Sequence, residues 1–134
     1  MSAGTTPARP SKRWAVGFAP AAVALCLALS ARPTQALAER RCGWLENPTP
    51  GNLWLKDASG FWTISTQGGP PAEGADRLPT PSPDRFVATN GHYGYSCACL
   101  DGAFDPASST VTRIDDANVE PLSVCRDDRR LPPP

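Results

Sequence analysis

The only histidine, both tyrosines and two of the five cysteines lie in one stretch, residues 90–100. It reads Asn-Gly-His-Tyr-Gly-Tyr-Ser-Cys-Ala-Cys-Leu, so that His92 follows an Asn-Gly turn signal and one residue separates Cys97 from Cys99. Imidazole, phenol and thiol groups can serve acid–base, nucleophilic or metal-binding chemistry. These side chains are therefore the first candidates for a functional site.

Catalysis by His92 lacks support in its surroundings. A general base needs a nucleophile or a positioned substrate, and no known catalytic motif accompanies the histidine. The acidic pairs at 115–116 and 127–128 are chain neighbours, whose side chains point to opposite faces of a strand. We expect no enzyme, no catalytic residue and no cofactor. An enzyme using His92 with Tyr93 or Tyr95 is the weaker hypothesis.

A metal site is the alternative function for the same atoms. His92, Cys97, Cys99 and one further cysteine could surround zinc or copper. The spacing argues against zinc, because paired ligands usually have two to four residues between them. We assign no metal ligand, and keep a periplasmic thiolate and histidine metal-binding protein as the second interpretation.

The first 38 residues are typical of a signal peptide. A basic region at 9–13 precedes an uncharged run at 14–29, and Ala-Leu-Ala at 36–38 matches a cleavage site. The apolar run is too short to span a bilayer. We expect export to the periplasm or the exterior, a mature chain beginning near Glu39, and no stable membrane insertion.

Cleavage there changes the charge of the protein. Four of the 13 basic residues are removed and none of the 13 acidic ones, which leaves a net charge of about −4. An acidic chain is a poor partner for nucleic acid or an anionic membrane surface.

The four cysteines that remain, Cys42, Cys97, Cys99 and Cys125, predict two disulfides in an exported chain. In a strand, Cys97 and Cys99 project from alpha carbons about 6.5 Å apart, whereas bonded cysteines have beta carbons about 3.8 Å apart. They should not pair with each other. Cys42 and Cys125 are each predicted to bond either Cys97 or Cys99, and both arrangements remain open.

The pattern of short runs and turns predicts an all-β fold, either a small antiparallel sheet or a partly open barrel of about five to six short strands. No helix of convincing length is expected. The strands are expected at 52–57, 61–66, 92–100, 110–114 and 119–125, with a strand or helical turn at 85–89 and a turn at 115–118. In the 52–66 hairpin, the expected register places Trp54, Lys56, Trp62 and Ile64 on one face.

Residues 39–125 are expected to form the disulfide-braced domain. Within it, the Pro- and Gly-rich segment 68–84 is expected to be a long, mobile surface loop. Residues 126–134 are expected to form a flexible tail.

Several motifs resemble those of a family of small exported bacterial proteins classed as a domain of unknown function, DUF4087. They are Cys-Gly-Trp at 42–44, Tyr-Gly-Tyr-Ser-Cys-Ala-Cys-Leu at 93–100 and Pro-Leu-Ser-Val-Cys-Arg at 121–126. The resemblance extends from Cys42 to Cys125. It implies a bacterial envelope or secreted setting and a single cysteine framework, and it assigns no activity.

The function we expect is a non-enzymatic binding or envelope-interaction module. Its partner would be a protein or an envelope component, with exposed aromatic side chains supplying contact area. The residues of the possible binding surface are Trp44, Trp54, Trp62, His92, Tyr93 and Tyr95.

Overall fold

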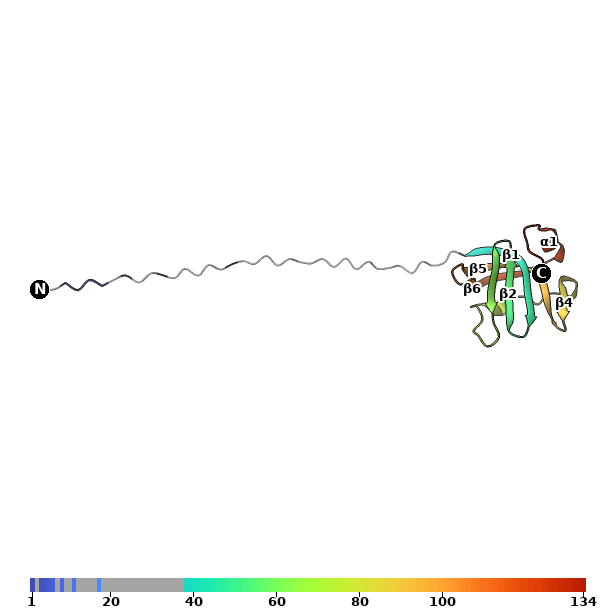
Figure 1. The fold of residues 1–134 in the computed structure, drawn as a ribbon, viewed down its shortest axis with the longest axis horizontal. Helices are drawn as coiled ribbons and strands as arrows, with labels where there is room; N and C mark the ends of the chain where they lie inside the picture. The colour runs from blue at the N-terminus through green and yellow to red at the C-terminus, as the bar shows by residue number, and fades with distance from the viewer. Residues whose placement is uncertain (2, 7, 9–10, 12–16, 18–37) are drawn as a thin grey trace. The chain divides into compact units, whose positions relative to one another are not determined.

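The computed structural model describes residues 1, 3–6, 8, 11, 17 and 38–134. Most of the predicted signal peptide, including residues 18–37, lies outside the described residues. The strands are β1 (Glu39–Thr49), β2 (Asn52–Asp57), β3 (Gly60–Ser65), β4 (Phe86–Asn90), β5 (Tyr93–Asp105) and β6 (Thr110–Glu120) (Figure 1). The helical segments are the 3-10 turns η1 (Ala75–Arg77) and η2 (Pro83–Arg85) and the α-helix α1 (Leu122–Asp127).

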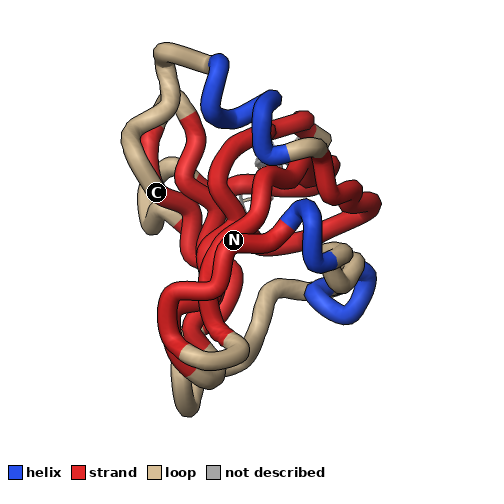
Figure 2. Tube along the Cα trace, turned by 90° about the vertical axis from the view of Figure 1, so that its right-hand side faces the viewer, coloured by secondary structure: helices blue, strands red, loops and turns tan. Residues whose placement is uncertain are grey.

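The strands form one sheet that closes on itself. Their order is β1-β2-β3-β6-β5-β4, and β1 also pairs with β5, so five strands make a ring with β4 attached beside it. Figure 2 shows the helical segments at the periphery of these strands. The all-β prediction is confirmed, as a mixed sheet in a ring that is not a regular barrel. In the part of the chain that the structure describes, no helix has the length and apolar character needed to cross a membrane.

The shortest strand pairing in the ring is the one between β3 and β6. These strands are parallel and share a single pair, Thr63 with Thr110. The Pro- and Gly-rich segment fills the rest of the gap through three backbone hydrogen bonds, from Ala72 N to Ile64 O (2.8 Å), Glu73 N to Thr112 O (3.2 Å) and Ile114 N to Glu73 O (2.8 Å). Part of the expected surface loop therefore completes the ring, because it satisfies backbone groups that the short parallel seam leaves free.

The core lies inside the ring. Leu55, Leu100 and Ile114 are fully buried there, and Trp62 packs edge-on against Phe104 with ring centroids 5.4 Å apart. The remaining buried members of this cluster are Leu45, Ile64, Ala98 and Val111. Burial of apolar surface from all five strands is the main favourable term for the fold.

The hairpin of β2 and β3 has a different register from the one expected. Leu55 pairs with Trp62, so these two side chains share the inner face. Trp54 and Lys56 point outward, and the prediction that they share a face with Trp62 was wrong. The turn after Asp57 contains two residues instead of three, and a shift of one residue moves every side chain to the other face.

The end of the chain also differs from the expectation. β6 runs through 115–118, where a turn was expected, and continues to Glu120. α1 takes the place of the rest of the strand predicted at 119–125. Pro121 explains the change, because proline cannot donate to a sheet ladder but is tolerated at the start of a helix. Its carbonyl accepts the first helical hydrogen bond, from Val124 N at 3.0 Å.

The segment 126–134, expected to be a flexible tail, is held against the outside of the sheet. Trp44 Nε1 donates to the Pro132 carbonyl at 3.0 Å, and Lys56 Nζ donates to the Pro133 carbonyl at 3.1 Å. Leu131 packs against the cluster that contains Trp44. Aromatic and basic side chains on neighbouring strands supply the contacts that composition alone did not indicate.

Candidate functional site

The two cysteines of β5 form two disulfides, one to β1 and one to α1. Cys42 of β1 bonds Cys99, directly opposite in the strand pairing, with alpha carbons 4.0 Å apart. Cys125 of α1 bonds Cys97, with alpha carbons 5.8 Å apart. The predicted two disulfides are confirmed, and the structure decides between the two arrangements. Because all four sulfurs are bonded, the thiolate metal site loses its ligands; among the described residues no cluster of His, Cys, Asp or Glu is placed to hold a metal ion.

Two of the three tryptophans proposed as binding surface are buried. Trp44 is 3% exposed on the outer face of the sheet, where Leu131 and Cys125 cover it, and Trp62 is 6% exposed in the core, so the surface prediction was wrong for both. Trp54 is half-buried on the outer face, where its Nε1 donates to Glu46 Oε2 at 2.7 Å. Phe61, which sequence reasoning missed, packs at a tilt against Trp54, with ring centroids 4.9 Å apart, and is 43% exposed.

The structure does not gather His92, Tyr93 and Tyr95 into one site. Tyr95 is half-buried on the outer face and packs edge-on against Trp44 at 5.3 Å. Tyr93 is half-buried two residues earlier, and His92 is exposed in the turn, where it lines a pocket with Leu53 and Phe86. The alternation of β5 puts Tyr93 and Tyr95 on its outer face, whereas His92 lies in the turn before the strand beside the inward-facing Gly94 and Ser96 that line the pocket.

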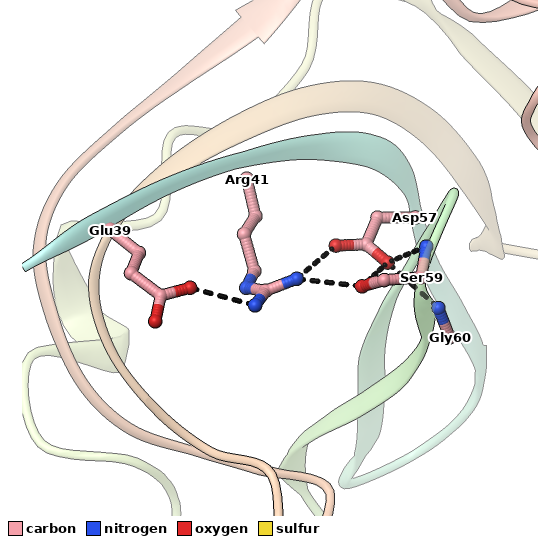
Figure 3. A network of polar contacts seen from close by, with 5 residues as sticks. All are labelled: Glu39, Arg41, Asp57, Ser59 and Gly60. Carbon is pink, nitrogen blue, oxygen red and sulfur yellow. Dashed lines mark hydrogen bonds and ion pairs between the residues drawn. The ribbon is translucent and has the colours of Figure 1, made fainter.

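One end of the ring is closed by a polar network around Arg41 of β1 (Figure 3). Its Nη1 donates to Asp57 Oδ2 at 2.9 Å and to Ser59 Oγ at 2.7 Å, and its Nη2 donates to Glu39 Oε2 at 2.7 Å. The guanidinium lies over the ring of Trp62, 4.2 Å from its centroid. A cation held between carboxylates and an aromatic face fits the exposed edge of an apolar core.

Electrostatics keep this pair charged. Burial raises the pKa of Asp57, but hydrogen bonds from Ser59 and Arg41 lower it more, so that its pKa lies below the ordinary value. Burial lowers the pKa of Arg41, and its contacts with Asp57 and Glu39 raise it above the ordinary value. Groups this firmly ionised suit structural support better than proton transfer.

The hollow beside this network is polar and electrically balanced. About 460 Å³ in volume, it is lined by residues that include three arginines and three acidic groups. Each arginine already has a carboxylate partner: Arg40 pairs with Asp101, Arg41 with Asp57, and Arg130 with Asp128. This end of the ring is therefore a closure whose arginines are already paired.

The other end of the ring, where β1 ends and β2 begins, contains an open pocket of about 350 Å³, here called the mouth pocket. Its walls come from β1, β2, the Pro-rich segment and the turn and strands of β4 and β5. The apolar lining is Leu45, Leu53, Leu78, Pro79, Pro81, Phe86 and Gly94, and the polar lining is Asn47, Thr80, His92 and Ser96. Ser96 is 3% exposed and places a hydroxyl in a largely apolar wall.

The chain matches the model of a known protein family. The model described as "Protein of unknown function (DUF4087)" matches residues 36–132. The chain belongs to this family. The DUF4087 match includes both disulfides, the Arg41 network and the mouth pocket, so all of them lie within the family domain. The curated proteins give no match, and neither do the solved structures.

Sequence reasoning missed two features of this DUF4087 domain. The alternation of β1 puts Arg41 on the same face as Gly43 and Leu45, which indicates an inward-pointing arginine that composition had left unnoticed. The mouth pocket had no comparable signal, because its walls come from segments far apart in the chain that only the closed ring brings together.

Proposed function

We propose that this protein is an exported, non-enzymatic binding domain that takes an apolar group of its partner into the mouth pocket. The observation that carries the proposal is the convergence of four separate segments on one concave, mainly apolar site. Ligand sites typically combine such a lining with a few polar groups, and they often occur at the mouths of β-barrels. Thr80, His92 and Ser96 would supply the polar contacts that orient the bound group.

The geometry of the pocket wall favours binding without large rearrangement. Arg77 Nη1 donates to the Ile114 carbonyl at 2.6 Å, directly before the Pro-rich part of the wall. Arg85 Nη1 donates to the Val119 carbonyl at 2.7 Å, directly before β4. Prolines between these two anchors further limit the backbone. A preformed wall reduces the conformational entropy lost when a partner binds.

Export is supported by the two disulfides, which are typical of oxidising compartments. If the full chain is produced in an exporting bacterium, we expect a periplasmic or secreted product that begins near Glu39. Its intact mass should be about 4 Da below that of the reduced chain, because each disulfide removes two hydrogens. A product that keeps residues 1–38 and free thiols in the cytoplasm would contradict this part of the proposal.

The pocket is tested with a fluorescent apolar probe, 1-anilinonaphthalene-8-sulfonate, titrated into the purified disulfide-bonded protein. Ser96→Leu fills the pocket from inside and Thr80→Trp covers it from the loop. We expect each variant to weaken probe binding by about tenfold, the effect of losing a well-buried apolar contact. Ser123→Leu, the same change at an exposed position of α1, is the control. Equal binding by all four proteins would contradict the proposed site.

A further inference from the structure

Residues 131–134 of the chain, Leu-Pro-Pro-Pro, occupy a site built by the outer face of the sheet. Two side chains donate to their backbone: Trp44 Nε1 to the Pro132 carbonyl at 3.0 Å, and Lys56 Nζ to the Pro133 carbonyl at 3.1 Å. Trp44 and Lys56 are direct neighbours across the β1–β2 pairing. Tyr95 stands edge-on to the Trp44 ring at 5.3 Å. These three residues, Trp44, Lys56 and Tyr95, are here called the Trp44 face.

The bound segment has the chemistry of a polyproline II strand. Proline fixes its own φ and pushes the preceding residue into an extended conformation, so consecutive prolines favour this helix. Proline has no N–H group, and the carbonyls are therefore the only backbone hydrogen-bonding groups that residues 132–134 can offer. An indole N–H and an ammonium group, both donors, match that requirement. Aromatic grooves that bind proline-rich segments use the same combination of ring surface and donors.

The hydrogen bonds that hold residues 131–134 do not involve the side chains of the segment. Pro132, Pro133 and Pro134 are all exposed, and the two hydrogen bonds go to backbone carbonyls that other proline-rich strands also offer. Leu131 is the side chain of the segment that anchors it, half-buried against Trp44, Cys97 and Cys125. A hollow of about 370 Å³ remains among Trp44, the end of α1 and the segment itself. Residues 131–134 thus contact the Trp44 face through one apolar side chain and two backbone carbonyls, groups that another leucine- and proline-containing strand can also supply.

We propose that the Trp44 face is a docking site for an extended proline-rich segment of a partner protein, and that residues 131–134 occupy it when the partner is absent. The site is separate from the mouth pocket, since the outer face of β1 and β2 carries it. The preferred partner segment has a leucine followed by prolines, the sequence that the chain itself places there. Residues 131–134 compete with the partner segment for the Trp44 face, and this competition lowers the affinity measured for the partner.

The test uses the full disulfide-bonded chain and the peptide Ac-Leu-Pro-Pro-Pro-NH2, with binding followed by the NMR signal of the Trp44 indole N–H. Leu131→Ser weakens the anchor of the resident segment. Because competition lowers apparent affinity by the fraction of free sites, we expect this variant to bind the peptide about fivefold or more tightly than the unchanged chain. A peptide with three alanines in place of the prolines is expected not to bind.

Two further variants in the Leu131→Ser background test the donors. Trp44→Phe keeps an aromatic ring but removes the N–H, and Lys56→Met removes the ammonium group. Each is expected to weaken peptide binding by about fivefold, the effect of one lost hydrogen bond. Peptide-induced shifts of backbone amides in β1 and β2 report binding to Trp44→Phe. Trp54→Phe, on the same outer face but outside the contact, is the matched control and should bind normally.

Three results would overturn the proposal. The first is the absence of peptide binding by both the unchanged chain and Leu131→Ser. The second is unchanged affinity in both donor variants while mass and near-ultraviolet circular dichroism show an intact fold. The third is dimerisation of Leu131→Ser that the peptide does not displace, which would make a second copy of this chain the occupant. Failure of probe binding in the mouth pocket would leave all three readouts unaffected.

Discussion

Asp57 organises the hairpin turn and also holds an arginine at the end of the core. Its Oδ1 accepts hydrogen bonds from Ser59 N and Gly60 N, which shape the turn between β2 and β3. Its Oδ2 accepts from Arg41 of the neighbouring strand β1. One carboxylate therefore couples a local turn to the closure of the sheet, and its charge state affects both.

We predict that Asp57→Asn lowers the free energy of unfolding at pH 7 by about 2 kcal/mol, the usual loss for charge-assisted hydrogen bonds. The pKa of Asp57 is lowered in the folded protein. A carboxylate whose pKa is lower in the folded than in the unfolded protein contributes its full stabilisation at pH values above the unfolded-state pKa of about 3.9. That contribution is lost as the pH falls through the lower pKa of the folded state. Urea unfolding measured between pH 7 and pH 2 should therefore show a shallower acid loss in Asp57→Asn.

Asp115→Asn is the control for this prediction. Asp115 pairs with Arg113 at 2.7 Å on the surface, where both side chains are exposed to solvent that screens the charges. Its removal should leave the stability at pH 7 close to that of the unchanged protein. The same acid loss in Asp57→Asn and the unchanged protein would show that the Asp57 network does not contribute as described.

At the scale of elements, β5 is the strand on which the ring depends. It pairs with β1 along one edge, and with β4 and then β6 along the other. Glycines at 94 and 102 allow neighbouring backbones to approach closely: a beta carbon at Gly94 would lie 1.9 Å from the Val87 carbonyl oxygen, and one at Gly102 would lie 2.0 Å from that of Arg113. These two glycines therefore permit the close approach of β4 and β6 to this strand.

Gly94→Ala is predicted to loosen β4. The added methyl group cannot fit against β4 without moving Val87 and Phe86, a displacement that typically costs about 1–3 kcal/mol. Amide hydrogen exchange should accelerate in 86–90 and change little in β2 and β3. Ala88→Ser, an exposed change on the same strand, serves as the comparison. If amide hydrogen exchange in β4 stays slow in Gly94→Ala, then the close approach of the β4 backbone to residue 94 does not require glycine.

The sequence predicted the elements whose signals are local. The β2–β3 hairpin and β5 appear where turn residues and alternation indicated, with the disulfides on one face of β5. The register of the hairpin was missed because two-residue and three-residue turns both suit Asp-Ala-Ser-Gly, and only burial of Trp62 distinguishes them. The role of 72–73 in closing the ring was missed because backbone hydrogen bonds leave no pattern in side-chain types. The mouth pocket was missed for a different reason, because its walls come from segments far apart in the chain.

At the scale of the whole molecule, the two disulfides constrain different parts of the fold. Cys42–Cys99 connects residues that already face each other in the β1–β5 ladder, across 57 residues of chain. Cys97–Cys125 connects β5 to α1, which no strand pairing holds. It also positions the end of the chain beside Trp44. One bond therefore reinforces the ring, and the other attaches an element to its outside.

We predict that removing either disulfide by a double Cys→Ala substitution lowers the free energy of unfolding by a similar amount, but that the two variants unfold locally in different regions. Chain entropy gives a loss of about 4 kcal/mol for Cys42→Ala/Cys99→Ala and about 3.5 kcal/mol for Cys97→Ala/Cys125→Ala, since loss grows only slowly with loop length. In the first variant, the same backbone amides should be protected from hydrogen exchange as in the unchanged protein, at lower overall stability, because ladder hydrogen bonds still join β1 to β5. The second should lose protection first in α1 and expose Trp44, with a red shift of tryptophan fluorescence before global unfolding in urea. If α1 stays as protected in the second variant as in the first, packing and not the disulfide holds this helix on the sheet.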